Sequence, residues 1–287
     1  MTNTDFKYEP SIIGKFARKL IPALQKSLPG PMYRSVYDFL YNSYKTLLRW
    51  SYIFNYIFYT LFGTKKQKLK VKLTLKLLTY TMGGRKALEN AFDVVDLVES
   101  NKITGSIVEC GVAEGGTAAM LGLANKYLGN ETRIKWFFDS YEGLPEPTEE
   151  DYVMGKTGNF IRPLPKGSCL GTIEQVSELM FGKLKFSSSE INLIKGWFQD
   201  TVPTTKNQIG QIAILRLDGD WYESTKIPLE NFYDQITEGG YIIIDDYLTC
   251  FGSRKAVDEY LENNSIHTVL NLDGRGGIWF KKPLSAK

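Results

Sequence analysis

Histidine and cysteine are scarce in this chain, and their scarcity excludes several kinds of site. The 287 residues include one histidine, His267, and three cysteines, Cys110, Cys169 and Cys250, with no CxxC pair. Zinc sites are built mainly from these two residue types, so the sequence argues against zinc. An odd number of widely spaced cysteines also argues against a disulfide framework. It is typical of a reducing compartment, and we therefore expect a cytoplasmic protein.

A signal peptide, a long apolar run and a strong charge of one sign are also missing. The first residues are polar and mixed in charge, so we expect no secretory leader. The net charge is +3, and the tract from Lys65 to Lys76 contributes six lysines and no acid, which leaves a net charge of −3 for the rest. Because nucleic-acid binders usually spread positive charge over a binding face, we expect no nucleic-acid partner.

Residues 1–80 are predicted to form a separate helical and basic region. Apolar residues from Leu40 to Leu61 recur at helical spacing, and the strongest apolar run, Tyr52–Phe62, is short for a membrane span. This helix could pack in the core, act as a lid, contact a second subunit, lie in a membrane interface or cross a membrane. We also expect the protein to be a homo-oligomer. The lysine tract that follows favours an anionic lipid surface, so residues 36–76 are a candidate for peripheral membrane contact.

Residues 81–287 alternate between strand and helix patterns. Strands are predicted at 106–110, 133–138, 191–195, 212–217 and 241–244, around His267, and at 277–281 as part of a terminal hairpin. A helix containing Ile236 is predicted to stop at Glu238-Gly239-Gly240, and the proline-rich segment 141–168 is predicted to be a lid. The alternation predicts an α/β fold with a doubly wound, mostly parallel sheet covered by helices on both faces, which binds ligands beyond the carboxyl ends of its strands.

Four aspartates follow two of the predicted strands at that edge. Asp218 and Asp220 come after the strand 212–217, and Asp245 and Asp246 come after the strand 241–244. Clustered carboxylates are unfavourable unless they share a positive charge. A hard divalent cation such as Mg²⁺, held by oxygen ligands, is the simplest explanation. The alternative is that each aspartate caps the helix that follows it.

A glycine-rich turn lies between the first strand of this region and the next helix. It contains three candidate cofactor-binding residues, Glu109, Gly111 and Gly115. Its spacing matches neither the dinucleotide fingerprint nor the P-loop. Acids in this turn would repel a pyrophosphate but suit S-adenosylmethionine, which carries a sulfonium and an amino group. Asp139 ends the next strand, where a carboxylate could accept hydrogen bonds from both ribose hydroxyls.

Four sequence blocks resemble the signature blocks of macrocin-type (TylF family) O-methyltransferases, namely Glu109–Gly116, Asp139–Pro145, Leu217–Thr225 and Ile244–Tyr247. The resemblance implies a class I methyltransferase (Rossmann-like) sheet of seven strands, S-adenosylmethionine as donor, Mg²⁺, and methyl transfer to a hydroxyl of a sugar or a glycosylated small molecule. It further implies site roles for individual residues: Asp218, Asp245 and Asp246 as metal ligands, Asp220 as general base, and Glu109, Gly111 and Asp139 at the donor site, with Ser140 and Asp200 lining that site by analogy.

Two other functions stay open. Asp218-Gly219-Asp220 is also the DxD pattern of metal-dependent glycosyltransferases, although the pair Asp245-Asp246 and the acidic glycine turn speak against that activity. The other is a non-catalytic module that binds a membrane surface through residues 36–76. Under the methyltransferase hypothesis, the acceptor is a small molecule or a glycan.

Overall fold

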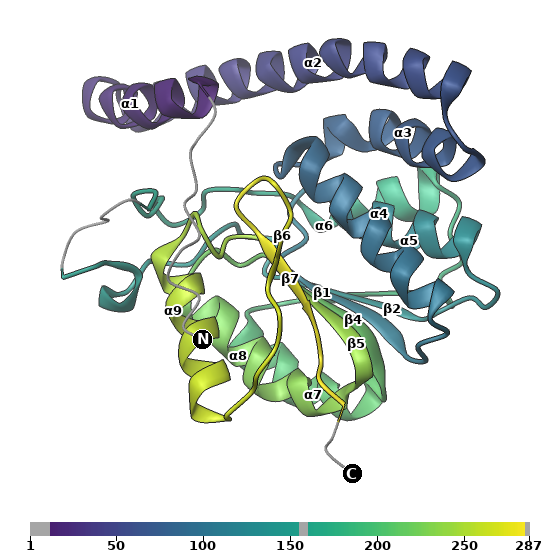
Figure 1. The fold of residues 1–287 in the computed structure, drawn as a ribbon. Helices are drawn as coiled ribbons and strands as arrows, with labels where there is room; N and C mark the ends of the chain where they lie inside the picture. The colour runs from purple at the N-terminus through teal and green to yellow at the C-terminus, as the bar shows by residue number, and fades with distance from the viewer. Residues whose placement is uncertain (1–11, 155–159, 285–287) are drawn as a thin grey trace. The chain divides into compact units, whose positions relative to one another are not determined.

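The chain divides into two compact units, with the boundary between Thr79 and Tyr80. The structure is a computed structural model, and it describes residues 12–154 and 160–284. The first unit is helical in its described part, and the second contains a sheet covered by helices (Figure 1).

Three successive helices make up the described part of the first unit: α1 (Ile12–Ser27), α2 (Gly30–Phe62) and α3 (Lys65–Leu77). α2 includes the helical pattern predicted from Leu40 to Leu61. α3 begins with a capping box, in which the Thr64 hydroxyl accepts the Gln67 N–H at 3.2 Å and the Gln67 side chain accepts the Thr64 N–H at 2.9 Å. Within the described ranges, no helix combines the length and the apolar character that crossing a bilayer requires.

A seven-stranded sheet in the order β3-β2-β1-β4-β5-β7-β6 forms the second unit. Its strands are β1 (Ser106–Cys110), β2 (Lys135–Asp139), β3 (Ile191–Lys195), β4 (Ile212–Leu217), β5 (Ile236–Ile244), β6 (Asn271–Leu272) and β7 (Ile278–Lys281). The first five strands pair in parallel, and β7 runs antiparallel to both β5 and β6. The predicted mostly parallel sheet and its terminal hairpin are therefore confirmed.

Helices cover both faces of this sheet (Figure 1). One face carries α4 (Gly84–Ser100) and α5 (Gly116–Leu128), and the other carries α7 (Phe198–Ile209), α8 (Tyr222–Phe232) and α9 (Phe251–Asn263). The short α6 (Ile173–Ser177) continues into a π-helical turn at Glu178–Lys183, and 3₁₀ turns lie at Leu78–Tyr80, Glu149–Asp151 and Tyr233–Gln235. Every residue of β4 is buried, as expected for a central strand covered on both sides.

The predicted end of the helix before β5 is wrong. α8 already ends at Phe232, and Ile236 begins β5, so the two glycines at 239 and 240 lie inside that strand. The pairing of β5 with β4 is irregular there, because Ile212 pairs with Ile236 while Ile214 pairs with Tyr241. The glycines accommodate this bulge instead of stopping a helix.

The strand predicted around His267 is also wrong. Residues 266–270 have no regular secondary structure, and the edge strand β6 begins only at Asn271. The Thr268 hydroxyl donates to the Lys281 carbonyl of β7 at 2.9 Å. A side chain thus takes a backbone acceptor that a ladder of backbone hydrogen bonds would have used.

Candidate active site

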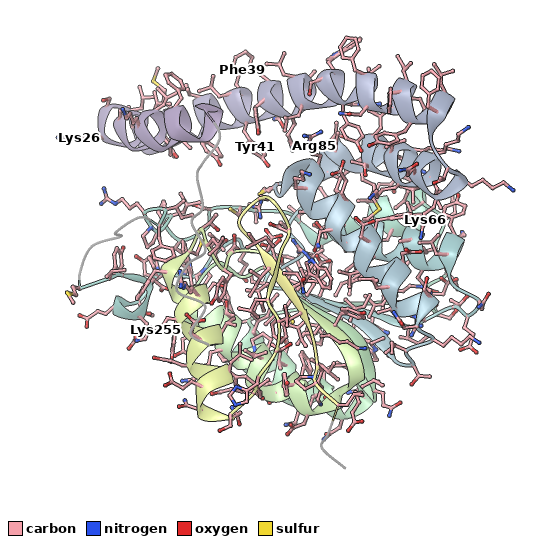
Figure 2. All side chains as sticks on the ribbon, in the orientation of Figure 1. Lys26, Phe39, Tyr41, Lys66, Arg85 and Lys255 are labelled. Atoms are coloured by element: carbon pink, nitrogen blue, oxygen red, sulfur yellow. The ribbon has the colours of Figure 1, made fainter. Side chains whose placement is uncertain are left out.

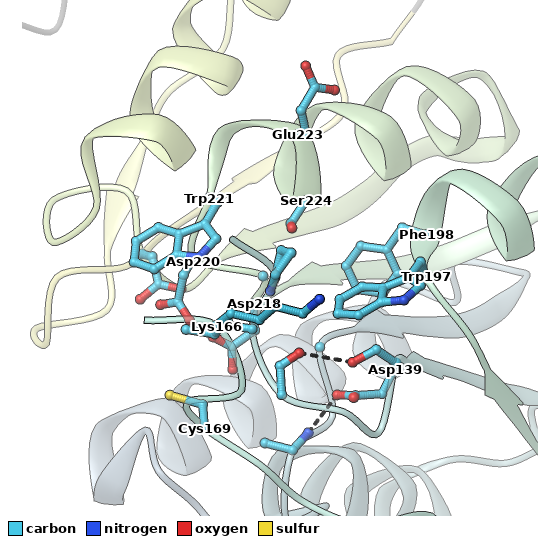
Figure 3. Close-up of a pocket in the computed structure, with 18 of the residues that line it drawn as sticks. Asp139, Lys166, Cys169, Trp197, Phe198, Asp218, Asp220, Trp221, Glu223 and Ser224 are labelled. Carbon is cyan, nitrogen blue, oxygen red and sulfur yellow. Dashed lines mark hydrogen bonds between the residues drawn. The ribbon is translucent and has the colours of Figure 1, made fainter. Parts of the chain in front are cut away.

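A cavity of about 540 Å³ opens at the carboxyl ends of β1, β2, β4 and β5. In doubly wound sheets this is the edge that binds ligands, beside the point where the strand order reverses. Six of the ten predicted site residues line the cavity: Gly111, Asp139, Ser140, Asp218, Asp220 and Asp246. Figure 3 shows Asp139, Asp218 and Asp220 among them. The sheet therefore brings the glycine-rich turn and the acidic cluster into one site.

Main-chain contact joins the turn after β1 to the turn after β4. The Asp218 N–H donates to the Cys110 carbonyl at 2.8 Å. A Cβ atom added at Gly111 would lie 1.9 Å from the Asp218 carbonyl oxygen, and the φ of Gly111 is +95°. Only glycine permits both this conformation and this approach. The close packing of the acidic turn therefore explains why position 111 is a glycine.

Asp139 fixes the shape of the glycine-rich turn. Its Oδ2 accepts the N–H groups of Val112 at 2.7 Å and Ala113 at 2.9 Å, and its Oδ1 accepts the Tyr141 N–H at 2.6 Å. Burial raises the pKa of Asp139, and these three donors act in the opposite direction. Ser140 donates in turn to the Gly143 carbonyl at 3.0 Å, so the end of β2 is held rigidly at the cavity wall.

A buried arginine in β4 pairs with three acids. Arg216 is 1% exposed, and its guanidinium donates to Glu109 Oε1 at 2.6 Å, to Asp218 Oδ2 at 2.8 Å and to Asp245 Oδ1 at 2.6 Å. The register of the sheet makes this possible, because Glu109 of β1 lies opposite Arg216 of β4. Much of the positive charge that the acidic cluster requires is therefore supplied by the protein itself.

A second arginine completes the pairing of Asp245. Arg275, from the turn before β7, donates to the other carboxylate oxygen of Asp245. Burial acts against the charged form of Asp245, but Arg275 and Arg216 together hold its pKa below the ordinary value. Asp245 is thus a buried, doubly paired carboxylate directly beneath the cavity.

Asp220 and Asp246 form no ion pair with any described residue. Asp246 is 4% exposed, and its Oδ2 is buried without a hydrogen-bond partner in the described part of the chain. Burial, followed by the charges of Asp218 and Asp245, raises the pKa of Asp220 to about 7. Burial, followed by the charge of Asp220, raises the pKa of Asp246 well above its usual range. An oxygen left without a partner in such a cluster requires a proton or a cation.

The acidic side chains are close enough to share a cation. One ligand oxygen from each of Asp218, Asp245 and Asp246 lies within 4.8 Å of the other two. Carboxylate oxygens are the ligands that Mg²⁺ and Ca²⁺ prefer. The sulfur of Cys250 also lies within 4.8 Å of ligand oxygens of Asp220 and Asp246, and its thiol donates to Asp220 Oδ1 at 3.6 Å. The donor set, with the partnerless oxygen of Asp246, fits a hard divalent cation.

The turn that carries Asp220 is held by a residue of the 141–168 segment. Asp151 is 3% exposed; it accepts the Tyr222 N–H at 2.8 Å with one oxygen and the Thr148 N–H at 2.8 Å with the other. Tyr222 is the first residue of α8, so Asp151 caps this helix from 71 positions away. Asp220 makes no cap bond and has a left-handed φ of +61°. The helix-cap interpretation of Asp220 is therefore wrong.

Four predicted site residues do not line the cavity. Glu109 and Asp245 lie beneath it and are paired with Arg216. Gly115 is the residue before α5 and has a φ of +86°, and Asp200 is exposed in the first turn of α7. Of these four, Asp245 still has a carboxylate oxygen within 4.8 Å of ligand oxygens of Asp218 and Asp246, whereas Glu109, Gly115 and Asp200 do not face the cavity.

Sequence reasoning missed several residues that line the cavity. Trp197, Phe198 and Trp221 supply aromatic surface, and Lys166 and Cys169 come from the segment between β2 and α6 (Figure 3). The aromatic pair directly after β3 was a signal that could have been used. Arg216 was a second signal, although it does not line the cavity. It is a cation in the middle of the apolar strand β4, and a buried charge needs a partner.

The described residues of the 141–168 segment form one wall of the cavity. Its Leu144 packs in a cluster with Trp221 and Cys250, and the Ile161 N–H donates to the Thr249 carbonyl at 2.8 Å. The segment is thus attached to the turns after both β4 and β5.

Known proteins resemble this chain in sequence. The profile of the family described as macrocin-O-methyltransferase (TylF) matches residues 59–282. Demethyldecarbamoylnovobiocin O-methyltransferase of Streptomyces niveus is 34% identical over 203 residues, which cover 71% of this chain and 76% of that protein. The 8-demethyl-8-(2,3-dimethoxy-alpha-L-rhamnosyl)-tetracenomycin-C 4'-O-methyltransferase of Streptomyces olivaceus is 32% identical over 211 residues, covering 73% and 78%.

A solved structure resembles the fold as well. The O-methyltransferase NovP superposes with a TM-score of 0.62 at 32% sequence identity, over 71% of this chain and 83% of that chain. The predicted class I methyltransferase fold is therefore confirmed.

Proposed function

Because the chain belongs to the macrocin-O-methyltransferase family, we propose that it transfers a methyl group from S-adenosylmethionine to a hydroxyl of a sugar or a glycosylated small molecule, with the help of Mg²⁺. Family membership establishes an O-methyltransferase, so a glycosyltransferase and a purely non-catalytic membrane module are both wrong as the main function. The sugar-bearing acceptor is inferred from relatives, one of which is named for a rhamnosyl tetracenomycin.

The main support for this proposal is that two sets of residues, from different strands of the sheet, line the same cavity. Gly111 and Asp139 come from the β1 and β2 ends, and Asp218, Asp220 and Asp246 come from the β4 and β5 ends. A donor site and a site that activates a hydroxyl have to be adjacent for direct methyl transfer.

We assign the donor to the β1 and β2 side of the cavity. Gly111, Asp139 and Ser140 would face S-adenosylmethionine, since they line the wall there. Glu109, Gly115 and Asp200 would act from behind or beside it: Glu109 through Arg216, Gly115 by setting the start of α5, and Asp200 from the first turn of α7. The acidic surroundings suit the sulfonium and amino groups of the donor.

We assign the cation to Asp218, Asp245 and Asp246. The partnerless Oδ2 of Asp246 supports this assignment. Asp245 already accepts one guanidinium N–H at each oxygen, but a carboxylate oxygen has a second lone pair to offer. When bound, the cation would lower the pKa of the acceptor hydroxyl and fix its direction.

Asp220 is the proposed general base. It faces the cavity, it is not used as a helix cap, and the Cys250 thiol donates to only one of its oxygens. In the reaction, the hydroxyl proton passes to the Asp220 carboxylate and the hydroxyl oxygen bonds to the methyl carbon. The sulfur–methyl bond breaks with its electron pair left on sulfur, which yields S-adenosylhomocysteine. General-base assistance of this kind contributes about 10²–10⁴-fold.

Binding and turnover test these assignments separately. Calorimetry should show binding of S-adenosylmethionine and no binding of UDP-glucose. With radiolabelled donor and a panel of aglycone-linked deoxysugars, EDTA should abolish transfer and Mg²⁺ should restore it. Asp220→Asn should keep donor affinity within about twofold while turnover falls about 100-fold or more. The exposed Asp234→Asn is the matched control.

Full activity in EDTA would refute the requirement for a cation. Wild-type turnover in Asp220→Asn would refute the assignment of Asp220 as the general base. The absence of donor binding by folded protein would refute the function as a whole.

A further inference from the structure

One side of α2 exposes large apolar side chains along almost its whole length. In the described part of this helix, eleven such side chains are between 36% and 77% exposed. At about 100° per residue they fall within an arc of about 140°. Figure 2 shows Phe39, which belongs to this arc, and Tyr41 on opposite sides of the helix. We call these eleven residues, which include Leu47, Trp50, Phe54 and Leu61, the α2 stripe.

No charged residue falls within the arc of the α2 stripe. The helix keeps its polar character on the other side, where Lys45 is 6% exposed and lies 4.8 Å above the Tyr41 ring. Contiguous exposed apolar surface of this extent is uncommon on proteins that act alone in water and marks a surface that binds something.

Positive charge surrounds the α2 stripe in the sequence. Residues 1–79 contain fourteen lysines and arginines against three acids, a net charge of +11, whereas residues 80–287 carry a net charge of −8. α3 follows α2 after a two-residue connection and exposes five lysines: Lys65, Lys66, Lys68, Lys72 and Lys76. The first unit therefore combines an uncharged apolar face with charged residues that are mostly basic.

We propose that the first unit binds the surface of an anionic lipid bilayer, with the α2 stripe among the outer acyl chains and the α3 lysines at the phosphate headgroups. An apolar face and a basic surface are the two features that hold helices in such an interface. A second copy of the chain that docked stripe against stripe would place one strongly basic unit against another. A nucleic acid would leave the apolar stripe in water.

Vesicle flotation of the full-length chain tests the proposal. We expect binding to vesicles of phosphatidylcholine and phosphatidylglycerol at 3:1, and at least about tenfold weaker binding to pure phosphatidylcholine. Raising the salt to 0.5 M should weaken the first interaction, because screening shortens the reach of the lysines. Methyl transfer is measured separately, so failure of either assay leaves the other result standing.

Two double variants with the same charge change isolate the apolar contribution. Leu47→Glu with Phe54→Glu places two acids in the α2 stripe, whereas Asn42→Glu with Thr60→Glu places two acids on exposed positions of the same helix outside the arc. The stripe variant should partition at least about tenfold more weakly than the matched control. Circular dichroism and donor binding verify that both variants are folded.

A third variant isolates the electrostatic contribution. Lys65→Gln with Lys66→Gln and Lys68→Gln should lose at least about tenfold in affinity for the phosphatidylglycerol vesicles, since each lysine near such a surface contributes about fivefold. Binding to pure phosphatidylcholine should stay unchanged.

Three results would overturn the proposal. The folded wild type fails to float with phosphatidylglycerol vesicles, or the stripe variant binds them as well as its control does. The third is a lipid-free dimer, seen by sedimentation velocity, that the stripe variant dissociates; this would identify a second copy as the occupant of the α2 stripe.

Discussion

Replacing Arg216 by methionine would test whether the protein itself neutralises its acidic cluster. Methionine has a similar length but neither charge nor N–H donors, so Arg216→Met removes three charge-assisted hydrogen bonds. The carboxylates of Glu109 and Asp245 are 1% and 2% exposed and cannot recover the interaction through water. Asp218 is 29% exposed and can be partly rehydrated.

The expected loss of stability depends on which of the buried acids keeps a cationic partner. Asp245 retains Arg275, whereas Glu109 loses the one cation that pairs with it among the described residues. Removing one partner of a buried ion pair costs about 3–5 kcal/mol. Burial already raises the pKa of Glu109 to about 8, and its protonation keeps the loss within this range. The free energy of unfolding should fall by that amount, out of a total of about 5–15 kcal/mol.

Urea denaturation followed by tryptophan fluorescence measures this loss. Four of the five tryptophans belong to the second unit, so the signal reports mainly its unfolding. With an m-value of about 2 kcal/mol/M, the midpoint should move down by about 1.5–2.5 M. Adding Glu109→Gln to Arg216→Met should recover part of the loss, because a neutral amide has no carboxyl group that must be protonated when it is buried without a cation.

A surface pair supplies the control. Arg254→Met breaks the partly exposed pair of Arg254 with Asp258, at 3.3 Å, together with the contact of Arg254 with the Tyr247 ring, and should lower stability by about 1 kcal/mol. If Arg216→Met costs no more than this control, the buried guanidinium is not what compensates the acids, and the reasoning fails.

Two further changes probe the turns around the cavity. Asp151→Ala should lower stability by about 1 kcal/mol through loss of the α8 cap, and should lower turnover more than donor affinity, because the turn that carries Asp220 is released; melting curves and steady-state kinetics check both effects. Gly111→Ala should cost about 1–3 kcal/mol and weaken donor binding, whereas Gly210→Ala, at a φ of +71° with no atom within 4 Å of the added Cβ, should cost less and spare binding; denaturation and calorimetry compare the two.

The sheet could be predicted because its central strands are continuous apolar runs between polar turns. β4 and the part of β5 from Tyr241 to Ile244 were found in this way, whereas Ile236 was wrongly assigned to the preceding helix; the acids that follow both strands belong to the carboxyl edge of any parallel sheet. The segment around His267 could not be assigned correctly. Its alternating pattern matches a strand, but in the structure the Thr268 hydroxyl donates to a backbone carbonyl of the neighbouring strand, a contact that the pattern does not indicate.

The roles of Arg216 and Asp151 could not be predicted, because their hydrogen-bond partners lie far away in the sequence. Arg216 appears in the sequence as an isolated cation within an apolar strand, and only the register of β1 against β4 reveals Glu109 as its partner. Asp151 lies in a polar, proline-rich segment 71 positions before the helix that it caps, so no local pattern indicates its role. Both contacts are set by tertiary packing.

The close approach of Gly111 to the Asp218 carbonyl has a consequence for how this enzyme could be re-engineered. The spacing between the glycine-rich turn after β1 and the acidic turn after β4 is set by main-chain atoms, which no side-chain replacement can move apart. The described part of the 141–168 segment lines the cavity with side chains such as those of Leu144, Glu146 and Lys166, which can be replaced. Under the proposed assignment of the donor and the acids, new acceptors are best sought by altering that wall, because the path of the methyl group is then left as it is.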